Sequence, residues 1–227
     1  NQSGKFEEMF QSLRKSFIKN VTEDKTIKFF FSRATSDKER HKTSTTWNNH
    51  ENIKIPFQDT FSDVKIEKVF GNHATKQGQP GSYVSYFQKK IMRALLKEES
   101  HDNPFLQHIF LGYYKSEKAF PYMALKPGST IQFFEGNICD VPNLQDFEMI
   151  SLSNLFDWSD ESFIRQCVKG FSNIRSGSSV LLRQLNNHKD WSPFFGEGFT
   201  EDKAFDKHWQ KKDRSFFYDH FRLFVKT

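Results

Sequence analysis

Apolar side chains in the first half of the chain recur at helical spacing. Residues 5–19 place them at every third or fourth position, which predicts an amphipathic helix. The same spacing returns between residues 82 and 114. There the pair Asn103-Pro104 divides two helices, because proline is well tolerated in the first turn of a helix. This half is therefore predicted to be mainly helical.

Between these helices, residues 32–54 are almost wholly polar, with Trp47 as a large apolar anchor. Such a composition predicts a loop or a mobile insertion with solvated charges. We accordingly expect a mainly helical N-terminal region over residues 1–125, carrying this insertion, and an α/β portion over residues 126–227. The two parts are expected to form one continuous domain.

The second half alternates between strand-like and helix-like segments. Residues 130–135, 147–152 and 179–185 read as strands, and the last two flank a segment over 159–175 with one apolar helical face. A strand, a helix and a strand joined by short connections predict parallel strands, hence an α/β fold with a mainly parallel sheet. The final segment 216–226 is β-like, and we expect it to close the sheet as an antiparallel edge strand.

Polar side chains follow two of the predicted strands. In open α/β sheets, ligands bind outside the carboxyl ends of the strands, so these loops predict a ligand site. Amide, hydroxyl and carboxylate groups beside an aromatic ring suit a nucleoside-like or amino-acid-like ligand. Alternatively, Asp157 and Ser159 cap the following helix and Trp158 belongs to the core. The side chains concerned are Asn137, Asp140, Ser153, Asn154, Asp157 and Trp158.

Composition and charge narrow the classes of function. The 227 residues include 27 Phe and carry a net charge of +5, with basic and acidic residues interspersed. Neither an RNP-like motif nor a concentrated basic stripe is present, so a nucleic-acid partner is not expected. The two cysteines, Cys139 and Cys167, make no disulfide framework, and no signal peptide or bilayer-spanning run is visible. We expect a cytoplasmic protein without a metal site, since no metal-spaced cluster occurs.

Four segments together resemble a known family. They are FGNHAT at 70–75, NPFLQHIFLGYY at 103–114, LSNLFDW at 152–158 and GSSVLLRQ at 177–184. Over about residues 65–227 the chain resembles the betaine-lipid synthase type of 3-amino-3-carboxypropyl transferase. The resemblance implies a Rossmann-like, class I methyltransferase-like fold, S-adenosylmethionine as the donor and a diacylglycerol-like lipid as the acceptor. It also implies contact with a membrane surface.

Roles for individual residues follow from the same resemblance. His73 and Asp157 are the two candidates for the base that deprotonates the acceptor, and the choice between them stays open. Phe70, Asn72 and Arg183 would face the acceptor. Arg183, if buried, needs either an ion-pair partner or an anionic ligand. The residues implied to hold S-adenosylmethionine are Asn137, Ile138, Asp140, Ser153, Asn154 and Trp158.

The chain departs from the family pattern ahead of residue 65. A glycine-rich loop after a first strand and an acidic residue ending a second strand hold the donor in that family. Neither is found here, and no GxGxxG occurs. The loop is expected either in an upstream region or to have been lost. The second hypothesis is therefore a non-catalytic binding module that keeps the methyltransferase-like fold with an incomplete donor site.

Overall fold

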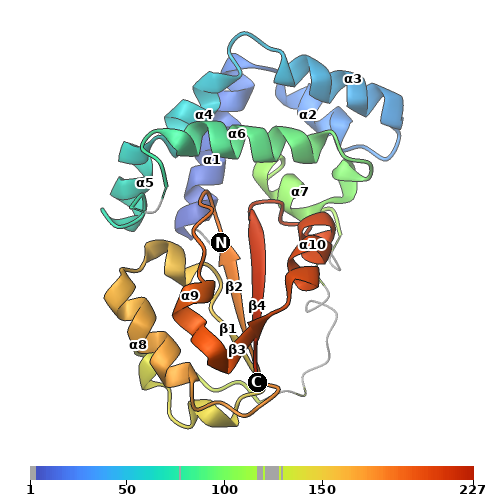
Figure 1. Ribbon diagram of the computed structural model, residues 1–227. Coiled ribbons are helices and arrows are strands. Elements are labelled where there is room, and N and C mark those ends of the chain that lie inside the picture. The colour runs from blue at the N-terminus through green and yellow to red at the C-terminus, as the bar shows by residue number, and fades with distance from the viewer. Residues whose placement is uncertain (1–3, 77, 117–119, 121–127, 129) are drawn as a thin grey trace. The chain divides into compact units, whose positions relative to one another are not determined.

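The computed structural model describes residues 4–76, 78–116, 120, 128 and 130–227 (Figure 1). Two compact units are present. The helical unit comprises Asn1–Pro127 and Arg214–Phe217, and the sheet unit comprises Gly128–Asp213 and Tyr218–Thr227. Within the described residues, no helix is long and apolar enough to cross a membrane.

The helical unit is held together by aromatic rings. The ring of Phe17 on the first helix lies edge-on to the rings of Trp47 and Phe110, at centroid distances of 5.5 and 5.2 Å. Such pairs add to the free energy gained by burying large apolar surfaces. The helices are α1 (Lys5–Asn20), α2 (Asp24–Phe30), α3 (Asp37–Asn48), α4 (Lys54–Phe61), α5 (Asp63–Phe70), α6 (Ser82–Leu95) and α7 (Pro104–Phe110), with a short 3₁₀ turn η1 (Ser100–Asp102) before α7.

The helices predicted over 5–19 and between 82 and 114 are confirmed as α1, α6 and α7. The break between the last two also lies where expected. Asn103 caps α7, because its side-chain oxygen accepts a hydrogen bond from the backbone N–H of Phe105 at 2.9 Å, and Pro104 occupies the first turn.

The loop predicted over 32–54 is wrong for residues 37–48, which form α3. Ser36 and Glu39 make a reciprocal capping box: the Ser36 hydroxyl accepts from the Glu39 N–H, and the Glu39 carboxylate accepts from the Ser36 N–H. Trp47 is only 2% exposed and anchors the helix in the aromatic core. Arg40 and Ser44 are buried as well, and Arg40 donates to the carbonyls of Phe30 and Ser32, so tertiary contacts stabilise a helix that the polar composition did not predict.

The sheet unit contains one mixed sheet of four strands in the order β1-β2-β4-β3 (Figure 1). β1 (Met149–Ser151) and β2 (Ser179–Gln184) are parallel and are joined through α8 (Glu161–Phe171). β4 (His220–Lys226) runs antiparallel to both β2 and β3 (Phe199–Glu201). The remaining elements are α9 (Ser192–Phe195), α10 (Lys203–Lys212) and the 3₁₀ turns η3 (Ile138–Asp140), η4 (Leu144–Asp146), η5 (Leu155–Trp158) and η6 (Gly196–Gly198).

The protein is thus α/β, and the predicted parallel pairing of 147–152 with 179–185 is confirmed in β1 and β2. The other two pairings of the described strands are antiparallel, so the mainly parallel sheet that the sequence predicts is not confirmed. Residues 130–135, by contrast, form no strand. Their side chains are exposed, Phe133 to 95%, and β-rich composition alone does not supply a ladder partner. The final strand is antiparallel as predicted, but β4 lies between β2 and β3 and is not an edge strand.

One apolar face of α8 packs on the sheet. Ile164, Cys167 and Phe171 belong to the same buried cluster as Ile150 of β1 and Val180 of β2. The predicted helix 159–175 begins later than expected, because Asp160 is its cap: the carboxylate accepts from the N–H of Phe163 at 2.9 Å. Ser159 instead donates its hydroxyl hydrogen to the carbonyl of Leu155.

Candidate functional site

The sequence SNLFDW begins where β1 ends. The ladder between β1 and β2 continues past the strand, since the N–H of Arg183 donates to the carbonyl oxygen of Ser153 at 2.7 Å. Ser153 has a positive φ of 50°, which turns the chain away from the sheet into η5. The Ser153 side chain is exposed and that of Asn154 is half-buried. These two residues therefore lie at the carboxyl edge of the parallel strands, as predicted.

Asp157 lies inside the sheet unit and is 6% exposed. One carboxylate oxygen accepts from the backbone N–H of Leu185 at 2.7 Å, and the other accepts from the side-chain amide of Asn187 at 2.7 Å. Burial raises the pKa of Asp157 to about 7, and the charge of Asp219 adds to this, while the two hydrogen bonds act in the opposite direction. The carboxylate thus ties η5 to the turn after β2 and does not cap α8.

A polar network continues across the sheet from this turn. Gln184 is fully buried, and its amide donates to the side-chain oxygen of Asn187 and to the carbonyl of Lys189, both at 2.9 Å. Its own oxygen accepts from Arg222 at 2.6 Å, and Arg222 pairs with Glu201 at 2.8 Å. The turn after β2 is therefore held by buried hydrogen bonds, which give a rigid base for the side chains at the carboxyl edge.

Arg183 precedes this turn on β2. Its guanidinium carbon lies 5.4 Å from the centre of the Tyr218 ring. Its Nε atom is buried and has no hydrogen-bond partner among the residues that the structure describes. Because the Nε–H is enclosed by protein atoms, an anionic ligand would have to meet the terminal nitrogens of the guanidinium.

Beside the same edge lies a chain of three titratable side chains that sequence reasoning missed. The Nδ1 atom of His220 is 3.0 Å from a carboxylate oxygen of Asp206, and its Nε2 atom is 3.2 Å from Nδ1 of His188. Asp206 belongs to α10, His220 begins β4, and His188 follows β2. The contacts join residues that are 14 and 32 positions apart in the sequence, so no local sequence motif predicts them.

The side chains of Asp206 and His220 are further fixed by their neighbours. The second oxygen of Asp206 accepts from the N–H of Phe221 at 2.7 Å. Burial would raise the pKa of Asp206, but hydrogen bonds from Phe221, His220 and Gln210 outweigh it and hold the pKa below its ordinary value. The Asp206 carboxylate is therefore ionised at neutral pH and can only accept hydrogen bonds.

Asn137, Ile138 and Asp140 do not lie after a strand, contrary to prediction, because residues 130–135 form none. Ile138 and Cys139 pack against the core cluster, and η3 lies along α8. Asn137 and Asp140 are exposed. The physical reason for placing them at the carboxyl edge is therefore gone. Trp158, in η5, is half-buried.

FGNHAT belongs to the helical unit. Phe70 ends α5, where its ring packs on that of Phe6 at a centroid distance of 4.8 Å. Asn72 and His73 are exposed in the turn that follows. Of the residues that the sequence brings forward, the structure thus gathers Ser153, Asn154, Asp157, Trp158 and Arg183 in one unit and places Phe70, Asn72 and His73 in the other.

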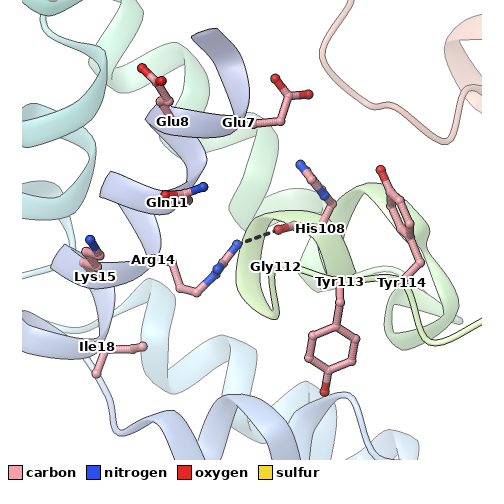
Figure 2. A pocket seen from close by; sticks show the side chains of 10 residues that line it. All are labelled: Glu7, Glu8, Gln11, Arg14, Lys15, Ile18, His108, Gly112, Tyr113 and Tyr114. Atoms are coloured by element: carbon pink, nitrogen blue, oxygen red, sulfur yellow. Dashed lines mark hydrogen bonds between the residues drawn. The ribbon is translucent and has the colours of Figure 1, made fainter. Parts of the chain in front are cut away.

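A groove of about 1000 Å³ opens on the helical unit between α1 and the end of α7 (Figure 2). Arg14 reaches across it and donates to the carbonyl oxygens of His108 and Ile109, at 2.8 and 3.0 Å. Burial lowers the pKa of His108, with Glu7 opposing this. Arg14 thus satisfies carbonyl oxygens at the end of α7 through Nε and one terminal nitrogen, and so ties α1 to α7. None of the predicted site residues lines this groove.

The two cysteines meet at the flank of α8, where their sulfur atoms are 2.9 Å apart. Cys139 is half-buried and Cys167 is buried, and burial, together with the hydrogen bond to Cys139, raises the pKa of the Cys167 thiol.

We expect oxidised glutathione to be attacked by Cys139 and the resulting mixed disulfide to be resolved by Cys167, giving an internal disulfide and two molecules of glutathione. Intact mass should fall by two hydrogen atoms. A mixed disulfide that persists on Cys139 would contradict this expectation.

Groups of three or more His, Cys, Asp or Glu side chains that could hold a metal ion are absent from the described part of the chain. No protein-family model matches the chain, and neither a curated protein nor a solved structure matches it.

Proposed function

We propose that this chain is an S-adenosylmethionine-dependent transferase that transfers the 3-amino-3-carboxypropyl group to the hydroxyl of a diacylglycerol-like lipid. The observation that carries the proposal is the position of SNLFDW at the carboxyl end of β1, beside the parallel strand β2. Ligands of open α/β sheets bind at this edge.

Some of the side chains at this edge have groups that can bind S-adenosylmethionine. The exposed hydroxyl of Ser153 and the amide of Asn154 can meet ribose hydroxyls or the ammonium of the methionine part. Arg183 is half-buried, and the terminal nitrogens of its guanidinium can meet the donor carboxylate or an anionic acceptor.

The proposed reaction needs few catalytic groups from the protein. The carbon next to a sulfonium sulfur is already activated, so the side chains have to align the hydroxyl and accept its proton. Of the two bases expected from the sequence, Asp157 has both oxygens engaged by Leu185 and Asn187. His73 is exposed in the helical unit. The proposal therefore does not use Asp157 as the base.

A lipid acceptor agrees with the surface that leads into β1. Five large apolar side chains are exposed there, and side chains of this kind insert into the interface of a bilayer. They are Ile131, Phe133, Phe134, Phe147 and Met149. We propose that this segment brings the sheet unit to the membrane surface where the lipid resides.

Calorimetric titration with S-adenosylmethionine, followed by assay of methylthioadenosine release in the presence of diacylglycerol vesicles, tests the proposal. We expect saturable binding that Asn154→Ala weakens roughly 5- to 10-fold, the loss of one hydrogen bond. Ser172→Ala, an exposed serine at the end of α8, serves as the matched control and should bind like the wild type. Absence of binding to the wild-type chain would overturn the proposal.

The second candidate is a binding module with an incomplete donor site. It is favoured by one observation: the described residues ahead of residue 65 form helices and no strand, so the strand and glycine-rich loop that hold the donor in the family are not found there. Saturable binding of S-adenosylmethionine without release of methylthioadenosine would favour this candidate over the transferase.

A further inference from the structure

When both imidazoles are neutral and Nδ1 of His220 donates to Asp206, the hydrogens of Asp206, His220 and His188 have one arrangement. The ionised Asp206 carboxylate, at 3.0 Å, is the nearer partner of that Nδ1 atom, and the amide nitrogen of Gln210, 3.3 Å from it, donates to the same carboxylate at 2.9 Å. The Nε2 atom of the neutral His220 ring is then an acceptor, and the Nδ1 atom of His188 must donate to it. The Nε2 atom of His188 is left without hydrogen, with its lone pair available.

This bare nitrogen lies on an exposed side chain at the carboxyl edge of the sheet. His188 is exposed, and it follows Asn187, which Asp157 and Gln184 hold in place. Gln184 and His220 are paired across β2 and β4. The imidazole is therefore carried by a rigid turn and faces outward at the end of the sheet where ligands of α/β folds bind.

A proton taken up by His188 can be passed inward. When Nε2 of His188 gains a proton, its Nδ1 hydrogen can move to Nε2 of His220, across 3.2 Å. The positive charge then lies on His220, 3.0 Å from the Asp206 carboxylate, where an opposite charge stabilises it. This is the logic by which a carboxylate that orients a histidine favours the imidazolium formed during proton abstraction.

We propose that His188 is a catalytic base whose Nε2 atom accepts the proton of a hydroxyl substrate, and that His220 and Asp206 are positioning residues that hold it ready and stabilise the resulting charge. The proposal rests on the proposed function in naming that hydroxyl as the lipid acceptor. It replaces Asp157 and His73 as the proton acceptor with a group that the sequence reasoning did not single out.

The hydroxyl oxygen forms a bond to the carbon next to the sulfonium sulfur, and the carbon–sulfur bond breaks with its electron pair going to sulfur, which becomes neutral. The O–H proton goes to Nε2 of His188, and water later removes it from the histidine pair. Methylthioadenosine, the aminocarboxypropyl ether and one proton are the products. General-base help of this kind contributes about 10²- to 10⁴-fold to a rate.

The first test compares His188→Gln with His208→Gln, an exposed histidine on α10 that serves as the matched control. In His188→Gln we expect methylthioadenosine release with diacylglycerol vesicles to fall about 100-fold or more, with the melting temperature and the Kd for S-adenosylmethionine unchanged. His208→Gln should keep wild-type activity. Activity of His188→Gln within about 3-fold of the control would overturn the proposal, since even the smallest general-base contribution exceeds that.

Two further variants separate chemistry from structure. His188→Gly should regain activity when imidazole is added, because the free base can occupy the space left by the side chain. Asp206→Asn can still accept from the N–H of Phe221, but its amide group would face His220 and reverse the direction of the hydrogen bonds. We expect loss of activity in Asp206→Asn with a folded sheet unit. Unchanged activity in this variant, or no rescue by imidazole, would count against the relay.

A measurement that needs no donor keeps the two proposals apart. Two-bond ¹H–¹⁵N spectra of the wild-type chain should show neutral His188 and His220 with hydrogen on Nδ1 and bare Nε2 atoms. Hydrogen on Nε2 of neutral His188 would overturn this inference even in an active enzyme. Conversely, the wild type could show the expected tautomers and fail to bind S-adenosylmethionine. That result would overturn the proposed function, while His188 would still be assigned as a proton acceptor for another hydroxyl substrate.

Discussion

Asp157→Ala is expected to lower the free energy of unfolding of the sheet unit by roughly 2–5 kcal/mol. The substitution leaves the N–H of Leu185 and the amide of Asn187 buried without their acceptor, and each unpaired buried group costs about 1–3 kcal/mol. Denaturant unfolding of the full chain measures the change. Asp146→Ala is the control, because its carboxylate makes an exposed ion pair with Arg175, worth at most about 1 kcal/mol.

The same variant decides whether Asp157 acts on a ligand. Because both of its oxygens are engaged within the unit, the loss of stability should be equal with and without S-adenosylmethionine. A ligand contact would instead reduce the stabilisation that the ligand provides, by about 1.5–3 kcal/mol for a charged hydrogen bond, and leave the free chain nearly unchanged. A melting-temperature difference between wild type and variant that appears only with ligand would therefore contradict the structural role.

The pH dependence of this contribution has a definite sign. The pKa of Asp157 in the folded chain is about 7, above the ordinary 3.8, so between these values the folded state holds a proton that the unfolded state lacks. Stability from this group is therefore greatest below about pH 4 and is lost as the pH rises towards 7, by at most about 1.4 kcal/mol per pH unit. The difference in unfolding free energy between wild type and Asp157→Asn should show this slope. A difference that is constant between pH 4.5 and 7 would refute it.

Trp191→Ala is expected to cost about 3–5 kcal/mol of unfolding free energy. The side chain is fully buried in the core cluster of the sheet unit, and its ring lies edge-on to that of Phe156 at 5.6 Å, so truncation leaves a large cavity. Trp191→Phe should cost much less, below about 1.5 kcal/mol. It keeps an aromatic ring and removes an Nε1–H that has no partner among the described residues.

The control for this pair is Trp209→Ala on α10, where the side chain is 41% exposed and lies outside the core cluster, so we expect a smaller cost. Chemical unfolding followed by circular dichroism avoids the change in fluorescence that each substitution brings. If Trp191→Phe proved as costly as Trp191→Ala, the indole N–H would have to be satisfied, and the account of this core position would be wrong.

Local signals in the sequence determined several elements. The apolar spacing of residues 5–19 is enough for α1, and Asn103-Pro104 sets the start of α7 because capping involves only adjacent residues. The apolar face ending at Phe171 and the strand from Ser179 likewise lead to α8, β2 and the parallel pairing with β1. In the candidate site, the position of Ser153 and Asn154 after β1 follows from the same reading. Helix periodicity and caps are encoded within a few neighbouring residues, so the sequence carries them directly.

Tertiary structure alone decided what depends on contacts between distant residues. β4 lies between β2 and β3, and residues 130–135 form no strand. The polar segment around Trp47 is helical, and the Trp47 ring packs in the aromatic core. The partners of Asp157 lie 28 and 30 positions away. The relay from Asp206 to His188 likewise joins a helix, a strand and a turn. Whether a carboxylate caps, binds or bridges depends on which donors the folded chain brings within about 3 Å of it, and local propensity does not contain that information.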